Sequence, residues 1–492
     1  MKAKYILLTL LLMTAFSCED IVDIEPQFAQ DAESYFQTEQ DYENALIGAY
    51  DMIGQSFLSL WLGEIASDNS IAGGESPNDT RSLHEIDEMV HTPESELELR
   101  RHLRFMYSGI TRTNFIFEFK DNLNFERKDE LLAEASFLRA YYYFQLVKVF
   151  GDVPLVVDRR LSIDEATSLA RTPKEEVYAQ IETDLIAAAE GLQWTSPVKG
   201  RVTKGAALGL LGRAYIYQDK FDEAAIVLDE LISDGPYSLI TVSTSGEYVE
   251  LFSVAQEGNS ESVFEIQHTG QEGSDFVAPQ AAESNWAIGF HSPKNYEGPV
   301  YDDGNSYNLP TEELYNSFAA GDIRRDGAIL NLIAWETSNP TVSYDVGTGG
   351  FTGYYNHKYM RRANELGAGD ERLTSPRNHR VLRLPEVLLM AAEAHNRKAA
   401  PNDAQAQMYL NMVRSRLGLA DVNASGTALT DAIWQERRWE TAGEGLRFFD
   451  LVRTGQAEAA IDGFVVGKHE VFPIPRSEID LSGGAWRQND NY

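Results

Sequence analysis

The chain has 492 residues, of which 43% are hydrophobic and 24% charged, a composition typical of a folded protein with a large buried core. Its 76 acidic residues against 42 Lys and Arg give a net charge of -34, which disfavours binding to nucleic acids and to other polyanions. With a single cysteine, the chain cannot form an internal disulfide or a cysteine-based zinc site.

The first residues are typical of a secretory signal peptide. Lys2 and Lys4 precede an apolar run over residues 5–13, and small or neutral residues follow up to Cys18. The run is shorter than the roughly 20 apolar residues that a membrane-spanning helix needs, and no later stretch reaches that length. We therefore predict a signal peptide over residues 1–17 and no transmembrane helix in the mature chain.

Cys18 follows small residues at positions 15 and 17, and this pattern resembles the lipoprotein box of bacteria. In that box the cysteine is lipidated and becomes the new N-terminus. Glu19 and Asp20 resemble the surface-export signal of lipoproteins in Bacteroidetes. The alternative is a plain signal peptide with an incidental cysteine. We expect Cys18 to carry lipid and residues 18–30 to form a tether, which holds the protein on a membrane without crossing it.

Helical periodicity follows the tether, up to about residue 234. Apolar residues recur at steps of three and four over 97–119, 131–149 and 177–192, which predicts helices with one buried face each. Glycines at 73 and 74 and the polar run 76–79 interrupt this pattern, so residues 54–91 are predicted to be a loop-like insert.

Two later segments predict helical hairpins. Residues 208–236 match the offsets of the tetratricopeptide (TPR) repeat, a pair of antiparallel helices. The matching positions are Leu211, Gly212, Tyr215, Ala224, Leu228 and Pro236. Residues 386–419 form a second, weaker pair, with the turn at Pro401, Asn402 and Asp403. TPR-like helical parts are thus expected over about 31–234 and 381–460.

The region between these parts, about 235–380, is rich in Gly, Ser, Asn, Pro and Tyr. It has only short helical or strand-like pieces, including a predicted strand in SVFEIQHT, residues 262–269. An irregular region of this length within a compact fold is usually functional. The sequence therefore predicts a mainly α fold, one domain over 31–492, with a loop-rich excursion over about 235–380.

Three long motifs resemble the SusD/RagB-type outer-membrane lipoproteins of Bacteroidetes. They are EASFLRAYYYFQLVKVFGDVPLV at 134–156, ERRWETAGEGLRFFDLVRTG at 436–455 and FPIPRSEIDLSGGAWRQNDNY at 472–492. Together with the opening CEDIVDIEP, they span nearly the whole mature chain, so chance is a poor explanation.

The resemblance implies a SusD-like α-helical fold with four TPR-like units and a loop-rich ligand-binding excursion. It also implies a partner, a SusC-like, TonB-dependent transporter in the outer membrane, against which the TPR side would pack. Such proteins are lipid-anchored on the extracellular face of the outer membrane. They act as hinged lids that capture ligands outside the cell, mostly oligosaccharides and, in some members, peptides.

No catalytic constellation emerges from the sequence, so an enzyme is not expected. HExxH and GxSxG motifs are absent, and the glycines of residues 347–350 lack the strand and helix of a phosphate loop. The acidic residues at 302 and 303 could touch a calcium ion, but they lack the full EF-hand pattern. No cofactor is therefore predicted beyond a possible structural calcium. We interpret Arg437, Arg438, Glu440 and Glu444 as a structural ion network rather than an acid–base cluster.

A neutral glycan offers CH faces, which aromatic rings cover, and hydroxyls, which Asp, Asn and Arg bind. We therefore looked for exposed aromatic residues on irregular segments, together with polar neighbours. The candidates are Trp61, Asp68, Asn69, Trp286, Tyr296, Tyr301, Tyr307, Trp335 and Tyr344. For each ring the alternative is a core aromatic that plugs a loop onto the helices, and for Trp61 the two are about equally favoured.

The sequence thus predicts a surface lipoprotein that captures a neutral glycan, such as a β-glucan or fructan, and delivers it to the transporter. An alternative is peptide capture by the same scaffold. A less favoured alternative is an extracellular glycoside hydrolase. Its two catalytic carboxylates could be any pair among the many acidic residues of the chain, but solvated acidic surfaces explain those residues better.

Overall fold

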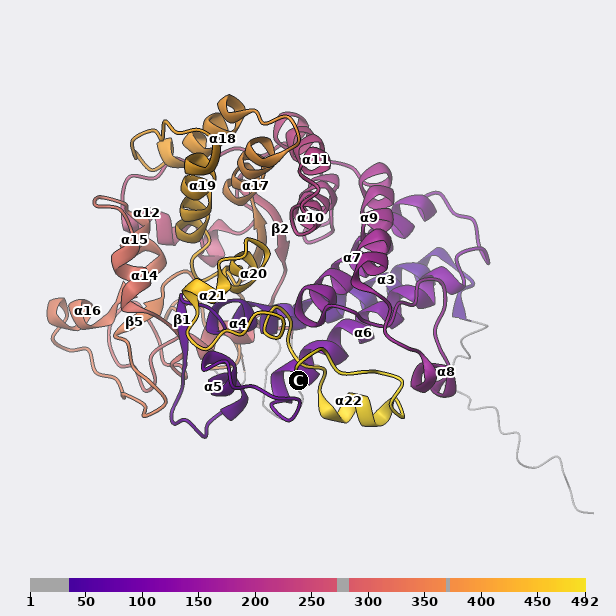
Figure 1. Ribbon diagram of the computed structural model, residues 1–492, viewed down its shortest axis with the longest axis horizontal. Helices are drawn as coiled ribbons and strands as arrows, with labels where there is room; N and C mark the ends of the chain where they lie inside the picture. Colours follow the sequence, from indigo (N-terminus) through magenta and orange to yellow (C-terminus); the bar gives the residue numbers. More distant parts are fainter. Residues whose placement is uncertain (1–34, 272–282, 369–371) are drawn as a thin grey trace, which may run out of the picture.

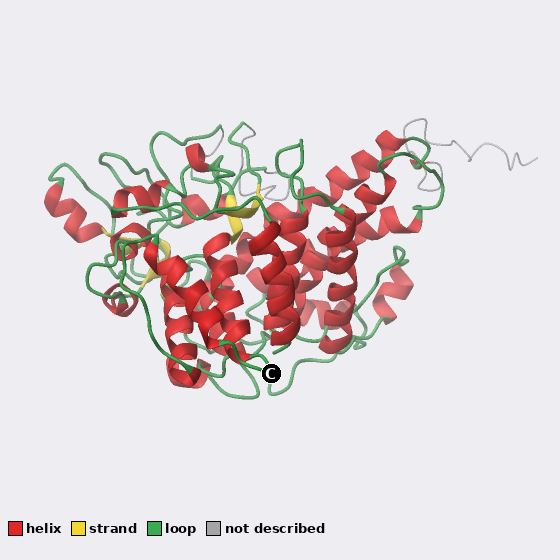
Figure 2. Cartoon of the chain, turned by 90° about the horizontal axis from the view of Figure 1, so that it is seen from above, coloured by secondary structure: helices red, strands yellow, loops and turns green. Residues whose placement is uncertain are grey.

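The computed structural model describes residues 35–271, 283–368 and 372–492, and the predicted signal peptide, Cys18 and the tether lie outside them. Figure 1 shows the long helices in an arc, and Figure 2 shows them side by side with the loops gathered along one side. None of the described helices combines the length and apolarity that a membrane crossing requires.

The arc is built from helices that pack against their neighbours in chain order, from α3 through α11 to α17 and α19. Its long helices are α3 (Glu39–Asp51), α6 (Leu97–Glu118), α7 (Lys128–Phe150), α9 (Lys174–Gly191), α10 (Lys204–Ile216), α11 (Phe221–Asp234), α17 (Leu384–Arg397), α18 (Asp403–Ser415) and α19 (Gly426–Glu440). The predicted hairpins at 208–236 and 386–419 are the pairs α10–α11 and α17–α18. The prediction of a mainly α, TPR-like fold is therefore confirmed.

Small residues let the paired helices approach closely. A Cβ atom added at Gly212 of α10 would lie 2.4 Å from Cδ2 of Leu228 on α11. A Cβ added at Gly109 of α6 would lie 2.3 Å from the ring of Tyr142 on α7. Glycine at these positions therefore sets the spacing of each pair, as the TPR offsets indicated for Gly212.

Helix α7 departs from the predicted single buried face. Nearly all its residues from Leu131 to Phe150 are buried, because α3, α6 and α9 all pack against it. Apolar residues on the other sides, such as Phe137 and Tyr141, were not part of the predicted stripe but belong to the same core.

The prediction of a loop-like insert over 54–91 is only partly right. This segment holds a 3-10 turn (Met52–Ser56), α4 (Phe57–Ile65), β1 (Ser70–Gly73) and α5 (Arg81–Asp87). Every residue of α4 is buried, so its sequence FLSLWLGEI has no polar side and gives no amphipathic signal. The short helix was missed because periodicity reports a half-buried helix and not a fully buried one.

The range 235–380 contains only short elements. Its helices are α12 (Ser245–Glu250), α13 (Trp286–Phe290), α14 (Glu312–Ser317), α15 (Arg324–Ala328) and α16 (Leu332–Ser338). Its strands are β2 (Ser262–Ile266), β3 (Tyr307–Pro310), β4 (Ile329–Asn331) and β5 (Tyr354–Asn356), and β6 (His379–Arg383) follows. Of these elements, α12, α14, α15, α16 and β5 lie on the left of Figure 1, and β2 lies nearer its centre. Antiparallel two-stranded pairs join β1 to β3, β2 to β6 and β4 to β5. Strand β2 confirms the predicted strand.

A buried ion network joins the short elements to the helical arc. The carboxylate of Glu440, at the end of α19, lies 3.1 Å from Arg324 of α15 and 2.9 Å from Arg383 of β6. Lys358 donates to the Glu440 carbonyl oxygen and pairs with Glu444 at 2.6 Å. Burial opposes the charge of Glu440, yet Arg416, Arg383 and Arg324 hold its pKa well below the usual range. Glu440 and Glu444 thus belong to a structural ion network, as the sequence predicted. The other two predicted members are ion-paired elsewhere: Arg437 with Glu386 and Asp450, and Arg438 with Asp68 and Glu313.

Three short helices follow α19 along the chain. They are α20 (Arg447–Arg453), α21 (Ala457–Ala460) and α22 (Arg476–Leu481). The C-terminal segment then returns to α7, where Asn489 donates to the carbonyl oxygen of Phe150 at 3.0 Å. Helix α8 (Ile163–Ser168) is a short surface helix with no buried residue.

Candidate ligand-binding surface

The structure buries most of the aromatic residues that the sequence proposed as exposed. Trp61 lies inside α4, is 5% exposed and donates through Nε1 to Nε2 of His291 at 3.0 Å. Trp286 begins α13 and is also 5% exposed. The prediction that these two rings are exposed on irregular segments is wrong, because both are part of the main core.

The three tyrosines of the loop 296–307 are buried as well. Tyr301 donates to or accepts from Nε2 of His357 at 2.7 Å, and Tyr307 is part of strand β3. Tyr296 accepts the Nε1–H of Trp335 at 3.0 Å and belongs with Tyr301 to a small core of the loop-rich region. The prediction that these three rings are exposed is therefore wrong too. They are core aromatics that hold the loop onto the rest of the protein, which is the alternative stated for each ring in the sequence analysis.

The two polar candidates tie elements together. Asp68 pairs with Arg447 at 2.7 Å and with Arg438 at 3.0 Å. Asn69 is 1% exposed and accepts from Arg438 at 2.9 Å. Because Asn69 is buried and the carboxylate of Asp68 is shared by two guanidinium groups, neither is placed to bind the hydroxyls of a ligand.

Trp335 and Tyr344 are the two aromatic candidates that the structure leaves half-buried at the surface. Trp335, on α16, lies edge-on to Tyr301 with ring centroids 5.3 Å apart. Tyr344 stacks on Phe351 at 6.0 Å with an interplanar angle of 26°, and its hydroxyl donates to Glu336 at 3.0 Å. These rings form an aromatic surface, defined by Trp335, Tyr344 and Phe351, over the small core of the loop-rich region.

Sequence reasoning missed Phe351. It lies in the glycine-rich stretch GTGGFTGY and satisfies the same criterion of an aromatic residue on an irregular segment. The sequence suggests only one role for the surrounding glycines, that of a phosphate-binding loop, and it lacks the strand and helix that such a loop needs. Two of these glycines instead allow close backbone contact: a Cβ at Gly347 would lie 2.2 Å from the carbonyl oxygen of Gly74, and one at Gly349 would lie 2.3 Å from that of Gly73.

A polar hollow adjoins this aromatic surface. Its volume is about 660 Å³, and it lies between the loop 75–79 and the loop 345–348, which directly follows Tyr344. The Thr348 amide donates to the carbonyl oxygen of Glu75 at 2.8 Å, and Lys294 pairs with Glu75 at 2.7 Å, so the two loops are fixed relative to each other. The lining residues are Glu75, Ser76, Asn78, Asp79, Lys294, Asp345, Val346, Gly347 and Thr348.

The hollow carries three carboxylates against one ammonium group. Hydroxyl groups donate readily to carboxylates, whereas anionic groups are repelled by them. Ring faces for CH groups and acceptors for hydroxyls therefore lie next to each other, as recognition of a neutral sugar requires. Val346, 55% exposed, adds an apolar side chain to the lining of the hollow.

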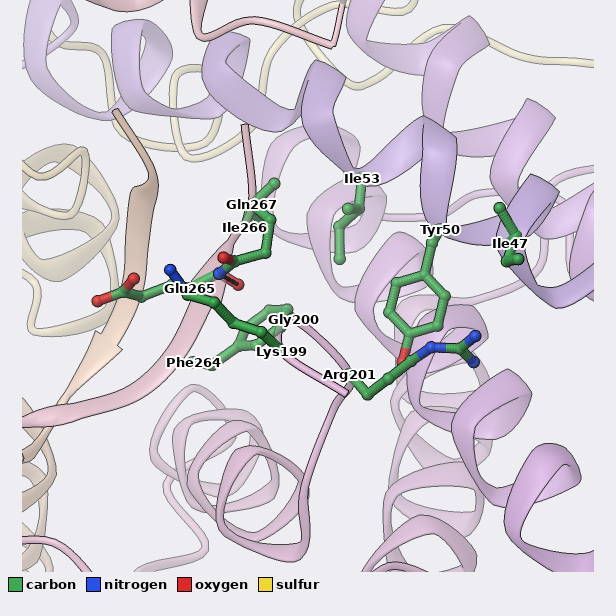
Figure 3. A pocket seen from close by; sticks show the side chains of 10 residues that line it. All are labelled: Ile47, Tyr50, Ile53, Lys199, Gly200, Arg201, Phe264, Glu265, Ile266 and Gln267. Atoms are coloured by element: carbon green, nitrogen blue, oxygen red, sulfur yellow. Dashed lines mark hydrogen bonds between the residues drawn. The ribbon is translucent and has the colours of Figure 1, made fainter. Parts of the chain in front are cut away.

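A second, smaller cavity of about 190 Å³ lies between α3, residues 199–201 and β2 (Figure 3). Its polar groups are already engaged, because Tyr50 donates to Glu134 at 2.6 Å and Arg201 pairs with Glu134 at 3.2 Å. Figure 3 shows the Tyr50 ring and Arg201 side by side in it. Two of its other polar side chains also have partners within the protein: Lys199 lies 3.5 Å from Glu257, and Asn378 donates to Glu265 at 3.0 Å.

The acidic stretch 302–305 was the possible calcium site. Asp303 pairs with Arg372 at 2.8 Å and accepts from the amide of Asn295, and Asp302 lies 3.6 Å from Arg361. Within the ranges that the structure describes, no group of three or more His, Cys, Asp or Glu could hold a metal ion. The carboxylates of this stretch thus have arginine and amide partners, and the calcium expectation stays untested.

Two family models match the chain. The model of the SusD family matches residues 260–470, and that described as starch-binding and associating with the outer membrane matches residues 22–216. A SusD-like protein of Formosa agariphila is 25% identical over 90% of this chain and 88% of its own length.

Solved structures of other proteins share the fold of this chain over almost its whole length. A laminarin-binding SusD-like protein is 32% identical, with a TM-score of 0.84 over 93% of this chain and 100% of the other. Surface glycan-binding protein A of Bacteroides thetaiotaomicron, solved with laminarihexaose, is 25% identical with a TM-score of 0.82 over 92% and 100%. The family models, the identity and the shared fold together show that this chain belongs to the SusD-like family.

Proposed function

We propose that this protein is a cell-surface glycan-binding lipoprotein that captures a neutral oligosaccharide or polysaccharide on the aromatic surface of Trp335, Tyr344 and Phe351. The observation that carries the proposal is the stacked pair of Tyr344 and Phe351 beside a hollow lined by carboxylates, amide and hydroxyl groups. SusD-like proteins bind glycans without transforming them, so the chain is not an enzyme.

The favoured ligand is a laminarin-type β-glucan, with a fructan as the second choice from the sequence. A relative that is 32% identical binds laminarin, and another was solved with laminarihexaose. The net charge of -34 and the acidic hollow both favour a neutral glycan over a sulfated or uronic one.

Delivery and location complete the proposal. We infer that Cys18 anchors the protein to the extracellular face of the outer membrane and that a SusC-like, TonB-dependent transporter receives the glycan. The lipoprotein box and the family description support the anchor, and the resemblance supports the transporter. Co-purification of a large outer-membrane barrel with the tagged chain would test the partner.

Calorimetry with laminarin, levan and alginate tests the ligand class. We expect laminarin to bind, and alanine at Tyr344 or Phe351 to weaken binding by about 1–3 kcal/mol, because each substitution removes one ring face. Tyr315→Ala is the matched control: Tyr315 stacks on Tyr354 at 4.6 Å in the loop-rich region but is not part of the aromatic surface. Equal losses in all three variants would argue against the aromatic surface, and binding of peptides without any glycan would argue for the peptide alternative.

A further inference from the structure

A second groove lies between α6, α8 and the segment that follows α22, with a volume of about 630 Å³. Figure 1 shows α8 toward the right of the molecule, whereas α16, the helix that carries Trp335, lies at its far left. Small-molecule sites in proteins typically have volumes of about 300–1,000 Å³. The groove is therefore large enough for a ligand of its own, separate from the proposed glycan site.

The inside of the groove is apolar. The rings of Tyr107 and Trp486 lie 6.1 Å apart within it. Their polar atoms are satisfied by the protein, because the Tyr107 hydroxyl donates to Pro154 at 2.9 Å and Trp486 Nε1 donates to Leu169 at 3.0 Å. The rings thus offer carbon surface to the groove, as do the aliphatic side chains of Leu103, Ile110, Val156, Leu161 and Leu169.

The charged side chains of the groove are four arginines and one glutamate: Arg104, Arg112, Arg159, Arg160 and Glu478. This excess of cations is the reverse of the whole chain, in which acidic residues outnumber basic ones by 76 to 42. Arg112 pairs with Asp51 at 2.5 Å and Arg160 with Glu118 at 2.8 Å, so the guanidinium groups that an anion would meet in the groove are those of Arg104 and Arg159. The hollow beside Tyr344, by contrast, repels an anion.

The arginines are held in place but keep donors for a ligand. Arg104 donates only its Nε–H, to Glu478 at 2.8 Å, and its two terminal amino groups make no hydrogen bond within the described part of the chain. Arg159 pairs with Glu165 at 2.8 Å with about half of its side chain exposed. Such exposed ion pairs contribute little stability, so an added anion can share these guanidinium groups at little cost.

We propose that this groove binds a small amphipathic anion. Its carboxylate or sulfate group would lie at Arg104 and Arg159, and its apolar body would lie on Tyr107 and Trp486. A guanidinium group binds such a head through two parallel N–H donors, and the aromatic rings supply apolar contact area for the body. A neutral sugar would leave the arginines without an anion, and a plain inorganic anion would leave the apolar walls empty.

A pair of fluorescent probes tests the proposal with the full-length soluble protein. The first, 8-anilinonaphthalene-1-sulfonate, is an aromatic anion, and N-phenyl-1-naphthylamine has the same aromatic body without the sulfonate. We expect the anionic probe to bind at a saturable site at least about tenfold more tightly, because charge-assisted hydrogen bonds add to the apolar contact. Equal affinity for the two probes would overturn the proposal.

Two variants locate the site. Replacing both Arg104 and Arg159 by Gln should weaken the anionic probe about tenfold or more and leave the neutral probe unchanged. Ala166→Glu adds a carboxylate at the exposed α8 wall and should weaken the anionic probe in the same way. Arg81→Gln is the matched control, because Arg81 is an exposed, ion-paired arginine of α5 outside the groove. Unchanged binding of the anion in the double variant, folded by circular dichroism, would overturn the assignment.

Displacement experiments then identify the apolar body. Dodecanoate and 3-phenylpropionate carry the same head group on an aliphatic and an aromatic body. Displacement of the bound anionic probe by either acid supports the site and says which body it prefers. If neither acid displaces the probe, the proposal fails, whatever the result of the laminarin experiment.

Discussion

Glu64, near the end of α4, is a fully buried carboxyl group that is not part of an ion pair within the described residues. Its two oxygens accept from the Gly445 amide at 2.8 Å and from Asn69 at 3.5 Å. Burial raises the pKa of Glu64 from 4.5 to about 7, and these hydrogen bonds only partly oppose the shift. Between these two pH values the folded chain therefore keeps a proton that the unfolded chain has lost.

This proton makes the stability depend on pH in a defined direction. Because the folded state binds more protons, the contribution of Glu64 to the free energy of unfolding falls as pH rises from 4.5 to about 7. Glu64→Gln cannot ionise, so we expect it to be more stable relative to the parent at pH 8 than at pH 4.5, by up to about 3 kcal/mol. Urea unfolding at the two pH values measures this difference.

The control for this prediction is Glu458→Gln, a change of an exposed glutamate on α21. Its stability relative to the parent should not change with pH. A difference between Glu64→Gln and the parent that is the same at both pH values would show that folding does not raise the pKa of Glu64.

At the scale of elements, α4 crosses the turn before α20 almost backbone to backbone. A Cβ atom at Gly63 of α4 would lie 1.9 Å from the carbonyl oxygen of Gly445, and Gly445 itself has a φ of +81°. Gly48 of α3 is also a helical glycine, but a Cβ there would meet nothing within 4 Å. Helix propensity favours alanine over glycine at both positions, so any difference between them comes from packing.

Alanine at these two glycines should have opposite effects. Gly63→Ala forces α4 away from the turn and should lower the free energy of unfolding by about 1–3 kcal/mol or more. Gly48→Ala should raise it by about 0.5–1 kcal/mol, because alanine loses less backbone freedom on folding. Denaturant unfolding of both variants checks this, and a stabilised Gly63→Ala would contradict the close crossing of α4 and the turn.

For the whole molecule, the proposed anchor decides where the protein acts. Cys18→Ala removes the thiol that would carry lipid, so we expect it to be processed poorly and to leave the membrane fraction. Membrane fractionation and labelling with radioactive palmitate measure both effects. Replacing Glu19 and Asp20 by alanine is the matched control, since it keeps the acylated thiol and should alter only display on the cell surface. A Cys18→Ala protein that is still acylated and anchored would refute the lipoprotein box.

The helical parts could be predicted from the sequence because their signal is local. Val177, Ile181 and Leu185 were assigned to one face of a helix by their spacing, and all three are fully buried in α9. The same holds for Leu211 and Leu228 of the α10–α11 pair. In an amphipathic helix the apolar residues of the buried side recur at a fixed spacing, so a short stretch of sequence suffices to identify that side.

The candidate site could be predicted only in part. Trp335 and Tyr344 reach the surface as expected, yet Tyr301, in a similar polar loop, is buried under Trp335. No local sequence feature distinguishes the exposed Trp335 and Tyr344 from the buried Tyr301, because an irregular loop has no hydrophobic periodicity that marks its buried side. Phe351 joins Tyr344 only because the glycine-rich loop folds back on residues 73–75.

By itself, the sequence determined the helical scaffold and the family and predicted a lipoprotein box at its only cysteine, because periodicity, repeat offsets and contiguous motifs depend on the local order of residues. Only the tertiary structure decided which aromatic rings face solvent, that Asp68 and Asn69 serve Arg438 and Arg447, and that four arginines meet around an apolar groove. Those properties depend on segments far apart in the chain, which only packing brings together.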